Sequence, residues 1–443
     1  MSISAFEGAA GCGKTYSVIE YVQEKIAHAT LLPHQKLLAL TFMHGARLRL
    51  DGHLKNIDVL ASRYEAVTLD SFVWRICHRW RARAREIGIA IPAIGDFNAH
   101  CSLAGRLLAE PDIRAWVATG YPFVLVDEAQ DLHLSRLEIL GELAKVCSVA
   151  IAFDDFQCLD VSNRPVAVIE WVAGRCVPTK LSVNRRTNVT DLITAAHQIR
   201  CGQAITVSST SFKVMEAPGN KKSGPLLAAT MVGYALLKSG TFALLTPSRK
   251  SRYATQIVDL VNTTKLGKNK IGPFAVKWEG GDTSVEDGIR ASLAKCEQLT
   301  YDEAIALLQT FPIHAAINLT MGSLRRAYEA SGIAEFSASS VLTIFSRQLE
   351  MTRHFERKSG RMLAMTIHQA KNREFDHVVV LWPYEVGGDA ESKRRLLYNA
   401  VTRARKSCLI LVQSKALMNN APFVDDGFDT TINKNGTSPN SSV

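Results

Sequence analysis

The chain has 443 residues, of which 47% are apolar and 21% are charged, and its formal net charge is +10. That length is enough for two or three domains, and the basic balance favours polyanionic partners over acidic surfaces or neutral ligands. The nine cysteines lack zinc-ligand spacing, no signal peptide opens the chain, and no apolar run has membrane-spanning length, so we expect a cytoplasmic protein without a zinc module or a membrane partner.

The chain opens on a phosphate-binding loop, because residues 8–15 read GAAGCGKT and complete the pattern G-x-x-x-x-G-K-T. Residues 3–6 look like the strand before the loop, and residues 14–28 carry apolar side chains at helical spacing after it. In such a loop, backbone N–H groups wrap the phosphates at the positive end of the helix. Lys14 would reach the β- and γ-phosphates and Thr15 would hold Mg²⁺. The pattern predicts a site for ATP and Mg²⁺ formed by Gly8, Gly11, Cys12, Gly13, Lys14 and Thr15.

Short apolar runs alternate with amphipathic helices along the rest of the chain. The runs lie at residues 37–42, 123–127, 148–153, 242–246, 378–382 and 408–412. This alternation predicts an α/β fold in which mostly parallel sheets are covered by helices on both faces. Around residues 176–187 we expect a crossing between two lobes. From about residue 413 the chain becomes polar, which predicts a disordered tail.

The run at 123–127 ends in an acidic cluster that reads Asp-Glu-Ala-Gln-Asp. A buried strand in a parallel sheet presents such carboxylates at the carboxyl edge, beside a phosphate loop. Asp127 would bind Mg²⁺ directly or through water, and Glu128 would polarise the attacking water.

This cluster after a hydrophobic strand resembles the second helicase motif of the UvrD/Rep-like branch of superfamily 1. Other segments resemble further motifs in the family's order: 40–42 (Ia), 68–72 (a strand-contacting motif), 154–157 (III), 184–187 (IV), 366–375 (V) and 395–404 (VI). The resemblance covers roughly residues 3–412. It implies a compact DNA helicase with two RecA-like lobes, residues 1–180 and 181–412, and ATP in the cleft between them. A helical insertion at about 250–361 and a disordered tail at 413–443 complete the predicted organisation.

The resemblance also implies roles for single residues around the nucleotide. Arg186 and Arg403 of the second lobe would supply cations to a γ-phosphate bound on the first. Gln157 would sense the γ-phosphate, and Glu374 would contact the nucleotide sugar or help to close the cleft. Arg185 replaces the usual tyrosine that stacks on the base, which predicts weak discrimination between ATP and other purine triphosphates.

Proteins of this family move along a single strand by opening and closing the cleft once per ATP, usually 3′ to 5′. The positions that match strand-facing residues are Thr41, Phe42, Ser71, Thr366 and His368. Hydroxyl groups there suit phosphate contacts, and aromatic rings suit stacked bases.

Ser71 leads into a helix in which arginines alternate with tryptophans, among them Trp74 and Trp80. This pattern fits a strand-binding surface that includes Trp74. A solvated basic face with tryptophans in the core fits it equally well.

The chain also departs from the family at motif V and in the size of its insertions. The glycine of motif V is replaced by Asn372, a residue type that tolerates the left-handed conformation. Only about 40 residues separate Trp80 from Tyr121, which is too few for the accessory insertion of the first lobe, and the insertion of the second lobe is reduced. The motor motifs are therefore complete, whereas the parts that handle duplex are trimmed.

Two functions remain open at this point. The leading prediction is a single-strand-stimulated ATPase and translocase with helicase activity, on DNA because the family branch favours DNA. The alternative is an ATP-gated, nucleic-acid-binding subunit of a repair or antiphage-defence nuclease complex, which unwinds little alone. A non-motor phosphate-loop protein is disfavoured because motifs V and VI would have no role there.

Overall fold

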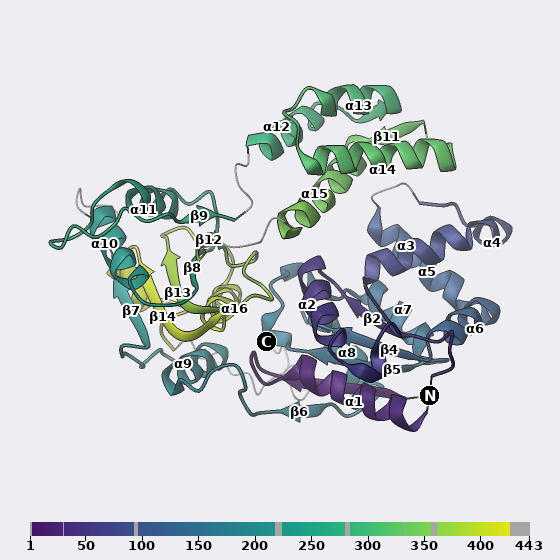
Figure 1. The fold of residues 1–443 in the computed structure, drawn as a ribbon, viewed down its shortest axis with the longest axis horizontal. Helices are drawn as coiled ribbons and strands as arrows, with labels where there is room; N and C mark the ends of the chain where they lie inside the picture. The colour runs from purple at the N-terminus through teal and green to yellow at the C-terminus, as the bar shows by residue number, and fades with distance from the viewer. Residues whose placement is uncertain are drawn as a thin grey trace, which may run out of the picture.

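The computed structural model describes residues 2–29, 31–92, 96–217, 224–279, 284–332, 334–355 and 361–425. Figure 1 shows two lobes, each a sheet with helices around it, and a small helical body above them. The predicted α/β class with two mostly parallel, helix-flanked sheets is confirmed. None of the helices in the described part of the chain has the length and apolar character needed to cross a membrane.

The first lobe is built on a parallel six-stranded sheet with the order β3-β2-β4-β5-β1-β6. Its strands are β1 (Ile3–Gly8), β2 (Leu37–Thr41), β3 (Tyr64–Thr68), β4 (Phe123–Asp127), β5 (Ser148–Phe153) and β6 (Thr179–Leu181). Its helices are α1 (Lys14–His28), α2 (His44–Leu54), α3 (Leu69–Arg79), α4 (Arg81–Glu86), α5 (Phe97–Ala109), α6 (Pro111–Gly120), α7 (Leu134–Ala144) and α8 (Ala167–Ala173).

Alternate side chains of the central strands explain why helices cover both faces of this sheet. In β2, Leu37 and Ala39 pack with α1 and α2, whereas Leu38 and Leu40 pack with α3, α5 and α7. Both faces are apolar, so the strand is a continuous hydrophobic run, as expected for a parallel sheet. Strand ends thereby become the only polar positions of the strand.

The second lobe repeats this plan with a parallel sheet of order β7-β14-β13-β8-β12-β9. Its strands are β7 (Phe212–Glu216), β8 (Phe242–Thr246), β9 (Lys277–Trp278), β12 (Met362–Thr366), β13 (Phe375–Trp382) and β14 (Ala404–Val412). Helices α10 (Gly224–Leu236) and α11 (Arg252–Thr263) cover one face, and α9 (Thr190–Arg200) and α16 (Ala390–Val401) cover the other. The face with α9 and α16 is turned to the first lobe, since residues of both helices bond to it.

The helical body has a hydrophobic core of its own. It contains α12 (Ser284–Leu293), α13 (Tyr301–Gln309), α14 (Ala315–Ser331) and α15 (Ala338–Phe355), with the antiparallel pair β10 (Gln298–Thr300) and β11 (Glu335–Ser337). The predicted insertion at about 250–361 therefore begins too early. Helix α11 packs on the second sheet and β9 pairs with β12, so both belong to the lobe.

The stretch after β14 also differs from the predicted tail at 413–443. A short 3₁₀ helix, Lys415–Asn419, follows the strand. Phe423 is buried beside Trp382, with ring centroids 5.8 Å apart, and its carbonyl accepts from the Ile205 N–H at 3.1 Å. One aromatic anchor thus holds a polar segment that composition alone marks as disordered. The predicted disorder is wrong for 413–425, and residues 426–443 lie outside the described residues.

Candidate functional site

The phosphate loop lies between the end of β1 and the start of α1, where the sequence pattern requires it. Gly11 and Gly13 have φ values of +86° and +76°, which favour glycine. A Cβ on Gly11 would lie 2.9 Å from that of Arg186, and one on Gly13 would lie 3.0 Å from Cδ of Arg185. The segment around Arg185 therefore packs directly against the loop, and side chains at these two glycines would push it away.

Two polar side chains of the loop, those of Lys14 and Thr15, lie where they could meet a phosphate and a cation. Lys14 is 7% exposed, and its Nζ donates to the Ala9 carbonyl at 3.1 Å and lies 3.9 Å from Asp154. The Thr15 hydroxyl donates to Asp127 Oδ2 at 2.8 Å. A hydroxyl beside one carboxylate is the usual protein share of a Mg²⁺ site, because phosphates and water complete the shell. These residues fit a Mg²⁺-bound nucleotide.

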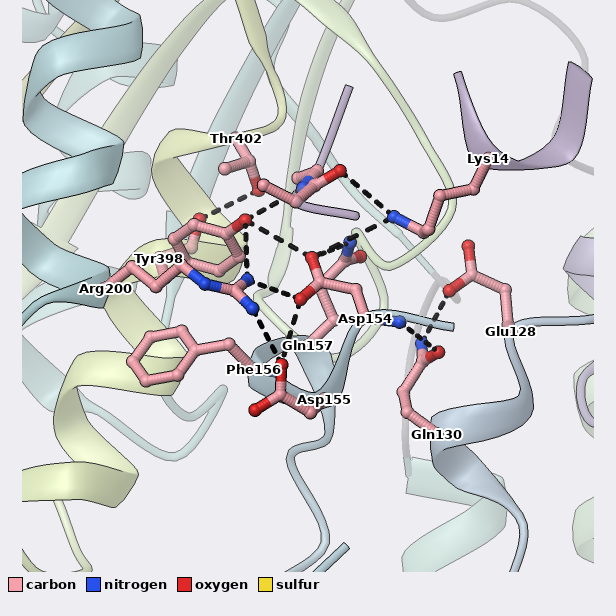
Figure 2. A network of polar contacts seen from close by, with 12 residues as sticks. Lys14, Glu128, Gln130, Asp154, Asp155, Phe156, Gln157, Arg200, Tyr398 and Thr402 are labelled. Carbon is pink, nitrogen blue, oxygen red and sulfur yellow. Dashed lines mark hydrogen bonds and ion pairs between the residues drawn. The ribbon is translucent and has the colours of Figure 1, made fainter. Parts of the chain in front are cut away.

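The acidic cluster sits at the end of β4 with both leading carboxylates buried. Glu128 adopts a left-handed conformation, with φ +58°, and its N–H donates to Asp127 Oδ1 at 3.1 Å. The Gln130 amide donates to Glu128 Oε2 at 2.6 Å, as Figure 2 shows. Burial and the neighbouring Glu128 charge raise the pKa of Asp127. Burial would raise the pKa of Glu128 as well, but nearby cations outweigh burial and lower this pKa. Arg49 has the largest effect among those cations.

Arg49, on α2, is a residue that sequence reasoning missed. Its Nη2 donates to Glu128 Oε1 at 3.2 Å and lies 3.5 Å from Asp127 Oδ2. Gln130 was part of the recognised motif, but its bond to Glu128 was not foreseen.

Asp154, at the end of β5, joins the loop to the second lobe. Figure 2 shows Arg200, Tyr398 and Gln157 converging on its carboxylate. Tyr398 donates at 3.2 Å, Gln157 donates at 2.8 Å, and Arg200 forms a close ion pair. Burial would raise the pKa of Asp154, yet Arg200 and then Lys14 lower it to about 2. A buried anion surrounded by donors from both lobes holds the lobes together at the back of the phosphate loop.

Two further contacts cross between the lobes at the same place. The Ala10 N–H of the phosphate loop donates to the Tyr398 hydroxyl at 2.8 Å. The Lys371 ammonium lies 2.6 Å from Asp131 Oδ1 and is buried with it. Asp131, Asp154, Lys371 and Tyr398 all stand inside recognised motifs, which could have marked them, whereas Arg49 and Arg200 carry no such signal.

Arg403 is the most deeply buried cation facing this site. Its side chain is 1% exposed and donates to the Asn399 carbonyl at 2.9 Å, the Thr402 hydroxyl at 3.1 Å and Gln157 Oε1 at 3.3 Å. Burial, with the charge of Arg186 second, lowers the pKa of Arg403 to about 9. Among the described residues no carboxylate forms an ion pair with it. The guanidinium is charged at neutral pH and bonds only to neutral acceptors, while the charges of Glu128 and Glu374 favour its charged form without forming an ion pair.

Arg186, the other predicted cation, is already paired. Its Nε donates to Glu374 Oε1 at 2.8 Å and its Nη1 to the Thr402 carbonyl at 2.8 Å. Arg405 also holds Glu374, at 3.0 Å. Glu374 and Thr402 thus hold the Arg186 side chain against the second lobe's own residues.

Arg185 lies at the mouth of the loop. Its N–H donates to the Gly11 carbonyl at 2.7 Å, and its guanidinium lies 5.4 Å from the ring centre of Tyr16. Tyr16 is 59% exposed and was missed by sequence reasoning. The two side chains offer a flat cation and an aromatic face beside the phosphate site.

The structure divides the predicted strand-facing residues into two groups. In the first lobe, the Thr41 hydroxyl is turned inward to the Met43 carbonyl at 3.2 Å, and Phe42 lies under Arg136 at 5.3 Å. The Ser71 hydroxyl accepts from Arg347 Nη2 of α15 at 2.8 Å. Of these three contacts, only that of Ser71 is with the helical body, whereas those of Thr41 and Phe42 stay within the first lobe.

The second group lies at the end of β12. Thr366 bonds to the Gln369 side chain, through its N–H at 2.9 Å and its hydroxyl at 3.2 Å, and His368 is exposed. Within the described part of the chain, no hydrogen bond or ring contact joins Thr366 or His368 to the first-lobe group.

The segment rich in arginine and tryptophan fits a strand-binding surface at one tryptophan and a core position at the other. Trp74 is 43% exposed, and its ring contacts those of His78 and His100, with centroids 6.1 and 5.2 Å away, so the ring is partly covered and partly open to solvent. Trp80 instead packs against the core edge-on to Trp116, at 5.9 Å. Arg75 and Arg83 form ion pairs with glutamates.

In the described residues, no group of three or more His, Cys, Asp or Glu side chains is placed to hold a metal ion.

Comparison with known proteins gives one sequence match. Residues 362–411, which carry β12, β13, α16 and most of β14, match the family model of the UvrD-like helicase C-terminal domain. This match bears out the resemblance that the motifs indicate. No curated protein matches the chain.

Similar solved structures include the Arterivirus nonstructural protein 10 (helicase), at 11% identity and a TM-score of 0.41. The same protein in complex with DNA has 12% identity and a TM-score of 0.39. Each alignment covers 95% of this chain but only 62% and 63% of those chains, respectively. The chain thus spans less than two thirds of the length of these helicases.

Proposed function

We propose that this UvrD/Rep-like superfamily 1 chain is an ATP-dependent motor on single-stranded nucleic acid. Residues 362–411, which match the UvrD-like helicase C-terminal domain, support the proposal. It hydrolyses ATP with Mg²⁺ between the two lobes and moves along the strand, with helicase activity as the outcome. We propose DNA as the track and 3′ to 5′ as the direction, both from the family resemblance. The +10 net charge supports a polyanionic partner, and the nine free cysteines support work in the cytoplasm.

One observation carries this proposal, namely the buried Arg403 without a carboxylate partner. A buried charge is costly unless it is paired, so natural proteins keep one where an anion arrives during function. Arg403 reaches the site from the second lobe and bonds to Gln157 of the first. A γ-phosphate on the loop would supply an anion for Arg403, and this attraction would favour closure of the second lobe on the first.

The chain's own residues divide the proposed chemistry. Lys14 and the loop N–H groups would hold the phosphates, and Thr15 and Asp127 would hold Mg²⁺. When bound, Mg²⁺ neutralises charge on the phosphates that are transferred. Glu128 would orient and polarise the attacking water, and Arg403 would stabilise charge that develops in the transition state. Gln157, bonded to Asp154 and Arg403, links this site to the lobe contact.

Steady-state phosphate release from ATP tests the proposal. It is measured alone and with single-stranded DNA, single-stranded RNA or blunt duplex. We expect strong stimulation by single-stranded DNA, weak stimulation by RNA and little by blunt duplex. Hydrolysis that no single strand changes would overturn the motor, and stronger stimulation by RNA would overturn the DNA track.

A second candidate function is favoured by the restraint on Glu128, which Arg49 and Gln130 hold on both carboxylate oxygens. A site restrained in this way suits an ATP-gated, nucleic-acid-binding subunit that waits for a repair or antiphage-defence nuclease. Strand displacement by the purified chain alone supports the motor. Tight strand binding without turnover, and activation only by a copurified nuclease, would support the gated subunit.

A further inference from the structure

A cation of the chain itself lies at the acidic end of β4. The Arg49 guanidinium donates to Glu128 Oε1 at 3.2 Å, and the Gln130 amide donates to Glu128 Oε2 at 2.6 Å. The carboxylate that would polarise the attacking water is therefore held by a cation on one oxygen and by an amide on the other. Both interactions withdraw electron density from the oxygens and fix their direction.

The same guanidinium opposes a metal ion. It lies 3.5 Å from Asp127 Oδ2, the oxygen that accepts the Thr15 hydroxyl at 2.8 Å. Thr15 and Asp127 are the residues proposed to hold Mg²⁺. Two cations at one carboxylate repel each other strongly in a buried site. Arg49 and Mg²⁺ should therefore compete for Asp127.

Arg49 is not fully satisfied where it lies. Its Nε is buried and has no hydrogen-bond partner in the described structure. A buried donor without an acceptor raises the free energy of this arrangement and lowers the cost of leaving it. The contact with Glu128 is thus one that a modest change in α2 can break.

Helix α2 connects this contact to the predicted strand track. It begins at His44, two residues after Phe42, which directly follows the end of β2 at Thr41. It also packs against α15 of the helical body, as Figure 1 shows, and α15 bonds to Ser71 through Arg347. A strand that contacts Phe42 and Ser71 would therefore touch both supports of α2.

We propose that Arg49 is a clamp on the Glu128 carboxylate and that a single strand bound at Phe42 and Ser71 releases it. The clamp rests on the proposed function, because Glu128 must be the residue that polarises water. Arg49 is a positioning residue: it acts on the water and on Mg²⁺ only through the two carboxylates. The clamp slows ATP hydrolysis in the absence of a strand. When a strand is bound, Glu128 is released and hydrolysis proceeds at its full rate.

The test compares Arg49→Gln with Arg47→Gln. Arg47 lies on the same helix and its variant makes the same change of charge, whereas its side chain forms no hydrogen bond or ion pair in the described residues. The first readout is phosphate release with and without single-stranded DNA. The second is the Mg²⁺ concentration that half-saturates binding of a fluorescent ADP, which needs no turnover. Strand affinity, measured by fluorescence anisotropy, checks that the track is unchanged.

We expect Arg49→Gln to raise the strand-free rate about tenfold, the effect of removing roughly one close charge pair, while the strand-stimulated rate stays near that of the wild type. The half-saturating Mg²⁺ concentration should fall several-fold in Arg49→Gln and stay unchanged in Arg47→Gln. Adding strand should lower that concentration in the wild type and leave Arg49→Gln unaffected.

Three results would overturn the clamp. An unchanged strand-free rate and Mg²⁺ requirement would show that Arg49 restrains nothing. An equal fall of both rates would make Arg49 a catalytic cation instead. The same gain in Arg47→Gln would assign the effect to helix charge. A wild type that hydrolyses no ATP with any strand would contradict the proposed function, and the Mg²⁺ titration would still decide whether Arg49 competes with the metal.

Discussion

The buried charged groups of the two lobes differ in whether they have a partner of opposite charge. On the first lobe, the buried carboxylates of Asp127 and Glu128 already have a cation, because Arg49 lies 3.5 and 3.2 Å from them. On the second lobe, the buried guanidinium of Arg403 has only neutral acceptors. In the proposed function, a Mg²⁺-bound triphosphate would compete with Arg49 for the first-lobe carboxylates and would supply an anion to Arg403. On this account, the nucleotide would draw in the second lobe through Arg403, whereas a bound strand would release Arg49 from the first lobe.

The largest effect should follow a change at the first-lobe carboxylate. Glu128→Gln removes the charge that polarises water and keeps the shape, so strand-stimulated phosphate release should fall about a thousandfold or more. Nucleotide and strand affinities should stay near normal, whereas Lys14→Ala should weaken nucleotide binding as well. Single-turnover hydrolysis and equilibrium binding of labelled ADP measure the two effects. Mild and equal losses in both variants would contradict the assignment of the site.

A change at the second-lobe cation should separate activity from stability. Arg403→Met should lower strand-stimulated hydrolysis about a hundredfold to a thousandfold, because transition-state charge loses its partner. The same substitution removes a buried charge that forms no ion pair, so the free energy of unfolding should rise by about 1 kcal/mol. Urea unfolding of the nucleotide-free protein measures the second effect. Lower stability would mean that the neutral acceptors of Arg403 compensate its burial.

The buried Asp154 carboxylate between the lobes should make the stability of the protein depend on pH. The pKa of Asp154 is lowered from 3.8 to about 2 in the folded protein. Its contribution to stability is therefore present above the unfolded value and is lost as the pH falls from about 4 to about 2, an effect of about 2 kcal/mol. Asp154→Asn should be less stable at pH 7 and should lack this part of the acid dependence. Parallel pH curves for variant and wild type would show that Asp154 does not carry the linkage.

The smallest effect should concern the base. Arg185 and Tyr16 offer surfaces on which any purine base could stack, and stacking does not distinguish adenine from guanine. ATP and GTP should therefore be hydrolysed at rates within about tenfold of each other. Tyr16→Ala should weaken the affinity for both nucleotides several-fold and by the same factor. A hundredfold preference for ATP would contradict the prediction.

Much of this arrangement could be predicted from the sequence. The phosphate loop and the buried strands at 37–42, 123–127 and 148–153 were visible because a parallel sheet needs uninterrupted apolar runs. Asn372, in place of a motif V glycine, was expected to tolerate a left-handed conformation, and its φ is +64°. These features depend on local chemistry, which neighbouring residues reveal.

The rest depends on contacts between distant segments. Strand β9 has two residues and β6 has three, so neither forms a recognisable run, and each is fixed by its partner strand. Arg49 and Arg200 are ordinary helix residues in the sequence, and their roles appear only when folding brings them to Glu128 and Asp154. Phe423 is one of two phenylalanines in a polar stretch, which composition cannot distinguish from a tail.

The most direct test of a site completed across the cleft is the affinity for ADP with aluminium fluoride and Mg²⁺ relative to ADP with Mg²⁺. The fluoride complex imitates the phosphoryl group in transfer, where Arg403 should act. We expect wild type to bind the fluoride complex at least about tenfold more tightly, and Arg403→Met to lose this preference while its affinity for ADP is unchanged. A preference that survives in Arg403→Met would contradict the claim that the second lobe supplies the cation to the phosphate.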